Sequence, residues 1–163
     1  MITQNILREM LHYNEDTGIF TWRVEPRNAT PPNIGDIAGC LCKTSGYVLL
    51  RIKGKLCRAH RLAFLYMTGS FPINQIDHIN GDRADNRWAN LRDVTNRTNS
   101  QNSRKPHSDN KLGILGVNRK KNRYQAQISI DGKNKSLGYF QTIDAAKDAY
   151  ITAKRKHHLG NTL

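Results

Sequence analysis

The chain has 163 residues, enough for one ordinary domain or two small ones with modest cores. Its 26 lysine and arginine residues outnumber its 13 aspartate and glutamate residues, which gives a formal charge of +13 at pH 7. A charge of that sign attracts polyanions, of which nucleic acid is the commonest. A membrane surface is disfavoured, because the sequence has no basic amphipathic helix and no apolar run of spanning length.

The first part of the chain shows short helical and strand patterns. Thr3 is placed to cap a helix that has apolar residues on one face, at Ile6, Leu7, Met10 and Leu11. "IFTW" is typical of a strand, and "GYVLLRI" and "KLCRA" flank Lys53-Gly54, which predicts a hairpin. "HRLAFLYMTG" predicts a helix that stops at Gly69.

The later part predicts two strands, "NQIDHI" and "NLRDVT", with a polar loop between them and a helix from about Asn96. Residues 103–112 are polar, contain one proline and are typical of a linker. The pattern then alternates, turns at Asp131-Gly132 and ends in a helix capped by Thr142. Residues 104–163 hold 13 basic and 4 acidic residues, a net charge of +9, so this part is expected to bind polyanions more strongly.

The cysteines and the N-terminus indicate a cellular compartment. "MITQNILREML" has no charged segment followed by an apolar one, so we expect the protein to act in a cytoplasm with its cysteines reduced. Cys40, Cys42, Cys57 and His60 form C-x-C…C-x-x-H, which can be written as a zinc site. The C-x-C spacing is unusual for zinc, and small apolar thiols in strands explain these cysteines as well.

The stretch "IDHINGDRADNRWANL" contains more polar residues than a turn requires, namely Asp77, His78, Asn80, Asp82, Asp85, Asn86 and Asn90. Hydrolysis of a phosphodiester needs a base for water, a cation for the developing charge and a scaffold for both. Asp77 offers the hard oxygen that Mg²⁺ or Mn²⁺ prefers. Neighbouring side chains on a strand face opposite sides of the sheet. Asp77 and His78 can therefore act at the same site only if the strand ends there.

The same stretch has a structural alternative, in which Asx turns stitch the loop together and His78 is a half-buried histidine with its hydrogen bonds satisfied. Asp82 and Asp85 are suited to closing the loop, and Asn90 to tying it to the second strand. An EF-hand is a poor alternative, because "DHINGD" lacks the alternating ligands and the terminal glutamate.

Asp77-His78, with Asn90 twelve residues after the histidine and Asn99 nine later, resembles the HNH nucleases with a ββα-metal fold. It is most similar to the phage homing-endonuclease branch, as are "AHRLAF" and "NRWANLRDVT", and the resemblance spans residues 46–102. It implies that His78 is the general base, that Asp77 and Asn99 bind a divalent metal ion, and that Asn90 braces the loop. Asn96 and Asn102 are alternatives for the last ligand, and a neutral ligand favours Mg²⁺ or Mn²⁺ over zinc.

The segment from "GILGV" to the end resembles an AP2 DNA-binding domain, through "GV", "RYQAQI", "LGYF" and "DAAKDAY". The resemblance implies a three-stranded antiparallel sheet packed on one helix, with the sheet in the major groove of double-stranded DNA. The residues that it implies as DNA-binding are Arg119, Arg123, Tyr124, Gln125, Gln127, Lys133 and Lys135. Asn118 and Tyr124 replace the arginine and tryptophan that are usual in that family.

The sequence therefore predicts an α+β protein with an HNH nuclease domain at residues 1–102, a linker at 103–112 and an AP2-like DNA-binding domain at 113–163. The expected activity is metal-dependent hydrolysis of DNA phosphodiesters, by a phage-encoded protein in a bacterial host cell. The alternative is a non-catalytic AP2-type DNA-binding regulator, against which the combination of Asp77, His78 and Asn99 argues. Whether the protein is a monomer or a dimer is left open.

Overall fold

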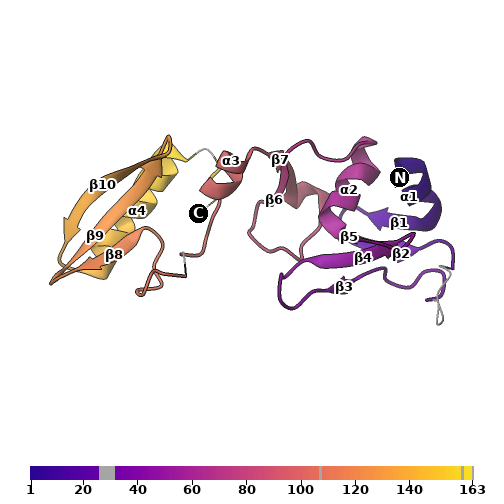
Figure 1. Cartoon of the computed structure of the whole chain (residues 1–163), viewed down its shortest axis with the longest axis horizontal. Coiled ribbons are helices and arrows are strands. Elements are labelled where there is room, and N and C mark those ends of the chain that lie inside the picture. The colour runs from indigo at the N-terminus through magenta and orange to yellow at the C-terminus, as the bar shows by residue number, and fades with distance from the viewer. Residues whose placement is uncertain (26–31, 107, 159, 163) are drawn as a thin grey trace. The chain divides into compact units, whose positions relative to one another are not determined.

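The computed structural model describes residues 1–25, 32–106, 108–158 and 160–162, and it divides the chain into two compact units, Met1–Thr95 and Asn96–Leu163 (Figure 1). Both units combine short helices with small antiparallel sheets, so the fold is α+β, as predicted. The boundary falls before the predicted linker 103–112, so that linker lies inside the second unit. In the part of the chain that is described, no helix is long and apolar enough to cross a membrane.

The first unit contains three antiparallel sheets, in which β1 pairs with β2, β4 lies between β3 and β5, and β6 pairs with β7. Its helices and strands are, in chain order, α1 (Gln4–Met10), β1 (Leu11–Asn14), β2 (Ile19–Trp22), β3 (Cys40–Leu41), β4 (Val48–Ile52), β5 (Lys55–Arg58), α2 (Ala59–Thr68), β6 (Gln75–His78), the 3₁₀ turn η1 (Trp88–Asn90) and β7 (Leu91–Val94).

The N-terminal helix is shorter than its apolar pattern predicts. Thr3 caps α1 as expected, because its hydroxyl accepts a hydrogen bond from the Ile6 amide at 3.4 Å. The helix ends at Met10, however, and Leu11 begins β1, so the prediction that Leu11 is helical is wrong. Leu11 and Tyr13 are buried and alternate with exposed neighbours, which is the pattern of a half-buried strand. The chain thus forms a β1–β2 hairpin that the sequence analysis missed.

Two other turns of the first unit are confirmed. Lys53 and Gly54 both have positive φ angles, 47° and 77°, as the two central residues of a tight hairpin turn between β4 and β5 require. Helix α2 stops where Gly69 adopts a left-handed conformation and donates its N–H to the Leu65 carbonyl oxygen at 3.0 Å. These elements surround one core, whose largest fully buried apolar side chains are Leu7, Leu11, Phe20, Leu50, Ile52 and Leu62.

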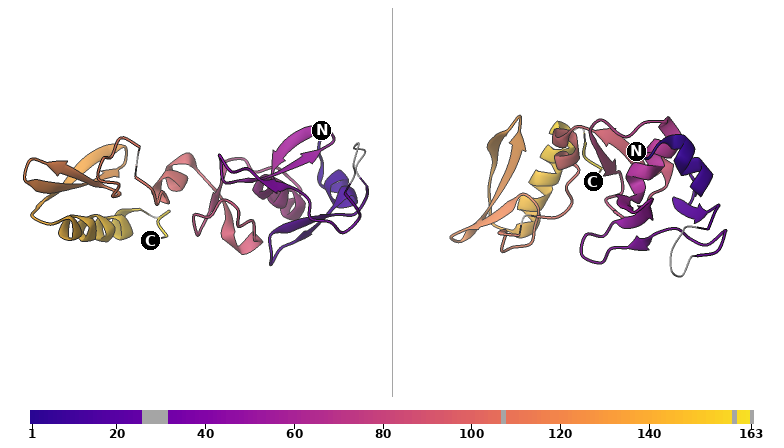
Figure 2. Two further views of the ribbon diagram at one scale, coloured as in Figure 1. Left: turned by 90° about the horizontal axis from the view of Figure 1, so that it is seen from below. Right: turned by 45° about the vertical axis from the view of Figure 1, so that its right-hand side comes forward.

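The second unit has the strand and helix content predicted for the C-terminal segment. Its three-stranded antiparallel sheet has β9 in the centre, and helix α4 lies along one face of that sheet (Figure 2). Asp131 and Gly132, with φ angles of 54° and 74°, form the predicted turn between β9 and β10. Thr142 caps α4 through its hydroxyl. The elements are α3 (Asn96–Gln101), β8 (Val117–Lys120), β9 (Arg123–Ile130), β10 (Lys133–Phe140) and α4 (Ile143–His157).

The predicted linker is fastened to the second unit by specific contacts. Lys154 on α4 is buried, and its ammonium group donates to the Ser103 carbonyl oxygen at 2.5 Å. Burial, together with the nearby charge of Arg104, lowers the pKa of Lys154 to about 8. Asn110 donates its side-chain amide to the carbonyl oxygen of Val117 at 3.0 Å. Ser103 and Asn110, both in the predicted linker, are therefore hydrogen-bonded within the second unit.

Candidate active site

The polar motif of the sequence lies on a β-hairpin with a long loop. Strands β6 and β7 are paired so that Asp77 is opposite Arg92 and His78 is opposite Leu91. Strand β6 ends at His78, whose carbonyl oxygen accepts a hydrogen bond from the Gly81 amide at 2.8 Å. The end of the strand thus coincides with the Asp-His pair, which is the position that the sequence analysis required.

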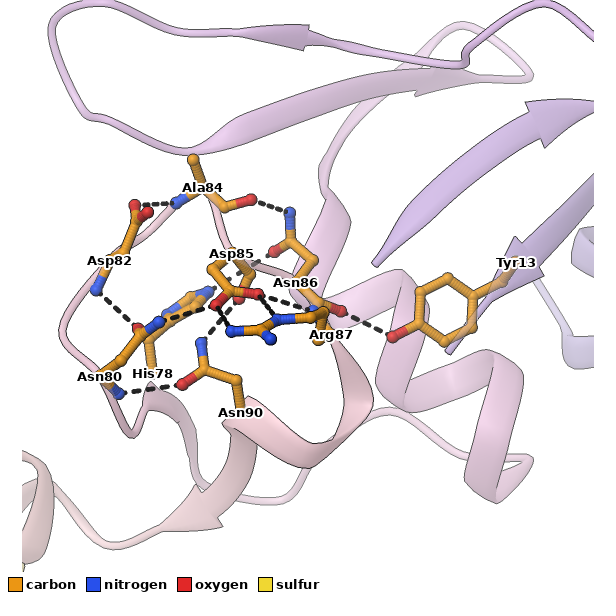
Figure 3. Close-up of polar contacts among 9 residues, drawn as sticks. All are labelled: Tyr13, His78, Asn80, Asp82, Ala84, Asp85, Asn86, Arg87 and Asn90. Atoms are coloured by element: carbon orange, nitrogen blue, oxygen red, sulfur yellow. Dashed lines mark hydrogen bonds and ion pairs between the residues drawn. The ribbon is translucent and has the colours of Figure 1, made fainter. Parts of the chain in front are cut away.

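Asparagine and aspartate side chains hold the loop between the two strands (Figure 3). The Asn90 side chain spans the loop, because its oxygen accepts from the Asn80 amide at 2.9 Å and its nitrogen donates to the Asp85 carbonyl oxygen at 2.8 Å. The Asn80 side-chain nitrogen also donates to the Asp85 carboxylate, at 2.7 Å. Asp82 closes the next turn by accepting from the Ala84 amide at 2.9 Å. The loop is therefore fixed by its own polar side chains.

His78 is enclosed at the end of β6, with 4 % of its surface exposed. Its ring meets the ring of His60 edge-on, with the centroids 5.0 Å apart, and the ring of Tyr47 lies 6.0 Å away. The His78 Nε2 atom is 3.5 Å from the side-chain oxygen of Asn86, which is itself buried. Protein groups thus limit the orientations that the His78 ring can adopt.

Burial of the two neighbouring histidines favours their neutral forms. Burial lowers the pKa of His78, and the hydrogen bond to Asn86 and the Asp77 carboxylate offset part of that effect. Burial also lowers the pKa of His60 to about 3, with a further contribution from His78. A neutral imidazole can accept a proton, as a general base must, so the environment of His78 suits that role.

Asp77 has 8 % of its side chain exposed and forms an ion pair across the hairpin. The Arg92 guanidinium donates two hydrogen bonds to the Asp77 Oδ2 atom, from Nε at 2.9 Å and from Nη2 at 2.7 Å. Among the described residues, no group of three or more His, Cys, Asp and Glu side chains is arranged to hold a metal ion. The Asp77 carboxylate is a hard oxygen donor of the kind that divalent cations bind.

The N-terminal hairpin supports the motif loop. The Tyr13 hydroxyl donates to the Asn86 carbonyl oxygen at 2.6 Å, and the Glu15 carbonyl oxygen accepts from the Trp88 amide at 2.9 Å. Gly18, which has a φ angle of 72°, packs so closely that a Cβ atom there would lie 2.4 Å from the Arg87 backbone nitrogen. The loop is thus bound to the first hairpin as well as braced internally.

The residues considered for the last metal ligand lie on or just after α3, in the second unit. Asn96 is exposed, Asn99 is half-buried, and Asn102 is buried with its side-chain oxygen accepting a hydrogen bond from the Thr162 hydroxyl. The Asn102 side chain is therefore hydrogen-bonded within the second unit.

The structure separates the residues that the sequence analysis assigned to DNA binding. Side chains alternate along a strand, and directly opposed residues share a face. Arg123, Gln125 and Gln127 therefore lie on the face of β9 turned away from α4. Tyr124 packs against the core, on the face of the sheet that α4 covers. The remaining three residues share that face, because each is paired with a residue on it: Arg119 with Tyr124, Lys133 with Ile130 and Lys135 with Ile128.

The cysteines lie apart from the motif loop in sequence, on and beside the β3–β4–β5 sheet, and all three are free thiols. Cys40 is exposed, and Cys42 and Cys57 are half-buried. Hydrogen bonds from Ser45 and Thr44 lower the pKa of Cys42 to about 7. The strand positions of Cys40 and Cys57 agree with the interpretation of small thiols in strands.

Sequence reasoning named Asn86 without giving it a role, and it missed three residues of this region: Arg92, Tyr13 and His60 as a neighbour of His78. The sequence did contain a signal for Arg92. "DH" ends the first predicted strand and "LR" begins the second, so antiparallel pairing of His78 with Leu91 places Asp77 opposite Arg92. The contacts of Tyr13 and His60 depend on tertiary packing, and no local spacing reveals them.

Comparison with protein families gives a match for part of the chain. Residues 57–101 match the family model for HNH endonuclease, and this segment contains Asp77, His78, Asn90 and Asn99. The match supports an HNH nuclease. No curated protein matches the chain, and no solved structure does.

Proposed function

We propose that this protein is a metal-dependent DNA endonuclease that hydrolyses phosphodiester bonds. The observation that carries the proposal is the position of His78: a buried histidine, whose pKa is lowered by burial, follows a buried carboxylate at the end of β6, within the segment that matches HNH endonucleases. That pairing supplies a base next to a ligand for a cation, which are the groups that phosphodiester hydrolysis requires.

His78 accepts the proton of the attacking water, and Asn86 and the His60 ring keep the imidazole in place. Asp77 and, by its motif position, Asn99 would hold Mg²⁺ or Mn²⁺. When bound, the divalent ion neutralises charge on the phosphate and the leaving oxygen. Asn90 keeps the loop in a single conformation through its bonds to Asn80 and Asp85. By resemblance to the phage homing enzymes, the products carry a 5′-phosphate and a 3′-hydroxyl.

The second unit reads the DNA sequence in this proposal. The net charge of +9 over residues 104–163 attracts the duplex, and the outer face of β9 presents guanidinium and amide donors from Arg123, Gln125 and Gln127. Such donors suit both phosphates and base edges, as in the AP2 domains that this segment resembles.

Incubation with supercoiled plasmid tests the activity. We expect nicked or linear product with Mg²⁺ or Mn²⁺, no product with chelator, and no product from His78→Ala protein. Plasmid that stays intact with either metal, over a range of salt concentrations and despite measurable DNA binding, would favour the non-catalytic regulator instead.

Removal of residues 104–163 tests the division of labour. We expect the truncated protein to bind DNA more weakly and to lose its site preference. The salt slope, which is the slope of log affinity against log salt concentration, should fall by about one unit for each phosphate contact removed. Equal affinity, salt slope and cut sites in both proteins would show that the second unit does not read DNA.

A further inference from the structure

Every acidic side chain of the segment from β6 to β7 already has a partner. Asp85 forms an ion pair with Arg87 at 2.6 Å, and Asp77 forms one with Arg92 at 2.7 Å. The carboxylates of Asp82 and Asp93 accept hydrogen bonds from backbone amides. The carboxylates of this segment are therefore compensated by cations or by backbone donors.

This arrangement leaves little net negative charge for a divalent cation. Asp77 and Arg92 together have a net charge of zero, and the other ligand proposed, Asn99, is neutral. The Arg92 guanidinium also contacts the Asp77 carboxylate itself, through two donors to one oxygen. A cation that approaches this carboxylate is repelled by a charge a few ångströms away, in a site where only 8 % of the carboxylate side chain is exposed.

Resting on the proposed nuclease function, we propose that Arg92 competes with the divalent metal ion for Asp77, so that the metal binds tightly only together with a DNA phosphate. The phosphate supplies the negative charge that the protein site lacks. It also gives the Arg92 guanidinium a second anionic partner, because arginine binds phosphate oxygens as readily as carboxylates. Arg92 is suited to such an exchange, since 27 % of its side chain is exposed.

The proposal has a thermodynamic consequence that can be measured without a substitution at Arg92. If DNA raises the affinity for the metal, the metal must raise the affinity for DNA by the same factor. Free protein should therefore bind Mn²⁺ weakly, and the complex with a duplex should bind it tightly. The protein would keep its metal-binding carboxylate neutralised until DNA arrives.

The test measures free Mn²⁺ by electron paramagnetic resonance, with full-length His78→Ala protein so that the duplex stays intact. Titrations are made with and without a short duplex of mixed sequence, and a titration of duplex alone is subtracted. Arg92→Gln removes the competing charge, Arg92→Lys keeps it, and Arg87→Gln removes an equivalent charge that is paired with Asp85 instead. Thermal unfolding of each variant checks that it is folded.

With Arg92 intact, we expect the duplex to tighten Mn²⁺ binding by about tenfold or more. Arg92→Gln should tighten Mn²⁺ binding in the absence of DNA by about tenfold and shrink the effect of the duplex. Arg92→Lys and Arg87→Gln should leave both quantities close to those of the parent. Unchanged or weaker Mn²⁺ binding by folded Arg92→Gln protein would overturn the proposal.

Two further outcomes separate this inference from the proposed function. If Arg92→Gln does not fold, the titrations of the protein with Arg92 intact still test the inference. It is overturned if the duplex leaves the Mn²⁺ affinity of that protein unchanged. Plasmid cleavage by the unsubstituted protein is measured in parallel. Cleavage without the Arg92 effect defeats only the inference, whereas the absence of both cleavage and Mn²⁺ binding in every arm defeats the proposed function as well.

Discussion

The Tyr13 hydroxyl donates a hydrogen bond of 2.6 Å to the backbone carbonyl oxygen of Asn86, 73 residues further along the chain. The contact joins strand β1 to the loop that leads from β6 to β7. Burial raises the pKa of Tyr13, and the carboxylates of Glu15 and Asp85 raise it further, so the phenol keeps its proton. Asn86 is the residue whose side chain faces His78, and Tyr13 thereby supports the proposed base from a distance.

We expect Tyr13→Phe to destabilise the protein by about 1–3 kcal/mol, because the Asn86 carbonyl oxygen loses a buried donor. Cleavage should also slow, since the loop that orients His78 becomes looser. Urea unfolding and plasmid cleavage measure the two effects. Tyr66→Phe is the matched control: Tyr66 lies in the same ring cluster, and its hydroxyl makes no hydrogen bond within the described residues. Equal losses in both variants would contradict a specific role for Tyr13.

Replacement of the proposed base should separate cleavage from binding. His78→Ala is expected to slow cleavage by about 10²–10⁴-fold while DNA affinity stays nearly intact, because the side chain acts on water and not on the duplex. Single-turnover cleavage and a filter-binding assay measure the two quantities. His12→Ala, at an exposed histidine, serves as control. Cleavage by His78→Ala at the parent rate in saturating metal would refute the mechanism.

The two proposed metal ligands should differ in how their loss is rescued. Asp77→Ala removes a charge, whereas Asn99→Ala removes a neutral donor, so high Mn²⁺ should restore cleavage more readily in Asn99→Ala. Calorimetry of Mn²⁺ binding in the presence of uncut duplex checks the assignment. Asp16→Ala removes an exposed carboxylate outside the motif as a control. Undiminished Mn²⁺ affinity in Asp77→Ala would rule out Asp77 as a ligand.

His60 makes folding stability sensitive to acid. Its pKa falls from 6.5 in the unfolded chain to about 3 in the folded protein, so the unfolded chain binds more protons between these values. The stabilisation is complete above pH 6.5 and is lost as the pH falls toward 3, by about 1.4 kcal/mol per pH unit. We expect His60→Phe to flatten the pH dependence of the urea midpoint in this pH range. An equally steep curve in His60→Phe would contradict this origin.

The two faces of the C-terminal sheet offer a paired test. Arg123 lies on the face turned away from α4, whereas Lys135, also exposed, is opposite core residue Ile128 in the strand register. If the outer face contacts DNA, Arg123→Ala should lower the salt slope of binding by about one unit, and Lys135→Ala should lower it less. Fluorescence anisotropy at several salt concentrations gives both slopes. A larger effect at Lys135 would place the contact on the other side of the sheet.

Local patterns were sufficient where one or two residues determine the backbone. Lys53-Gly54 and Asp131-Gly132 predicted hairpins because few residues tolerate the positive φ angles of such turns. Strand β1 was missed because Leu11 also fits the apolar face of the preceding helix, and only pairing with β2 decides between the two. A segment of so few residues fits the apolar spacing of a helix and that of a strand equally well.

The site was predicted in part. Asp77 and His78 stand at the end of a strand, as their sequence position suggested, and the alternation along β9 contained the signal that separates Tyr124 from Arg123. The Asp77–Arg92 pair required the register of β6 against β7, and His60 required the packing of α2 onto that hairpin. Such contacts arise from long-range packing, which short sequence windows do not record.

The close packing of Gly18 against the backbone of Asn86 and Arg87 determines how small a working fragment of this protein can be. Residues 57–101 match the family model, yet the loop within them packs against a hairpin that begins at Leu11. A gene segment trimmed to residues 57–101 would encode the motif without the β1–β2 hairpin that supports its loop. Chimeras and minimal versions must therefore retain the N-terminal hairpin, and a side chain introduced at Gly18 should disrupt them as effectively as a deletion.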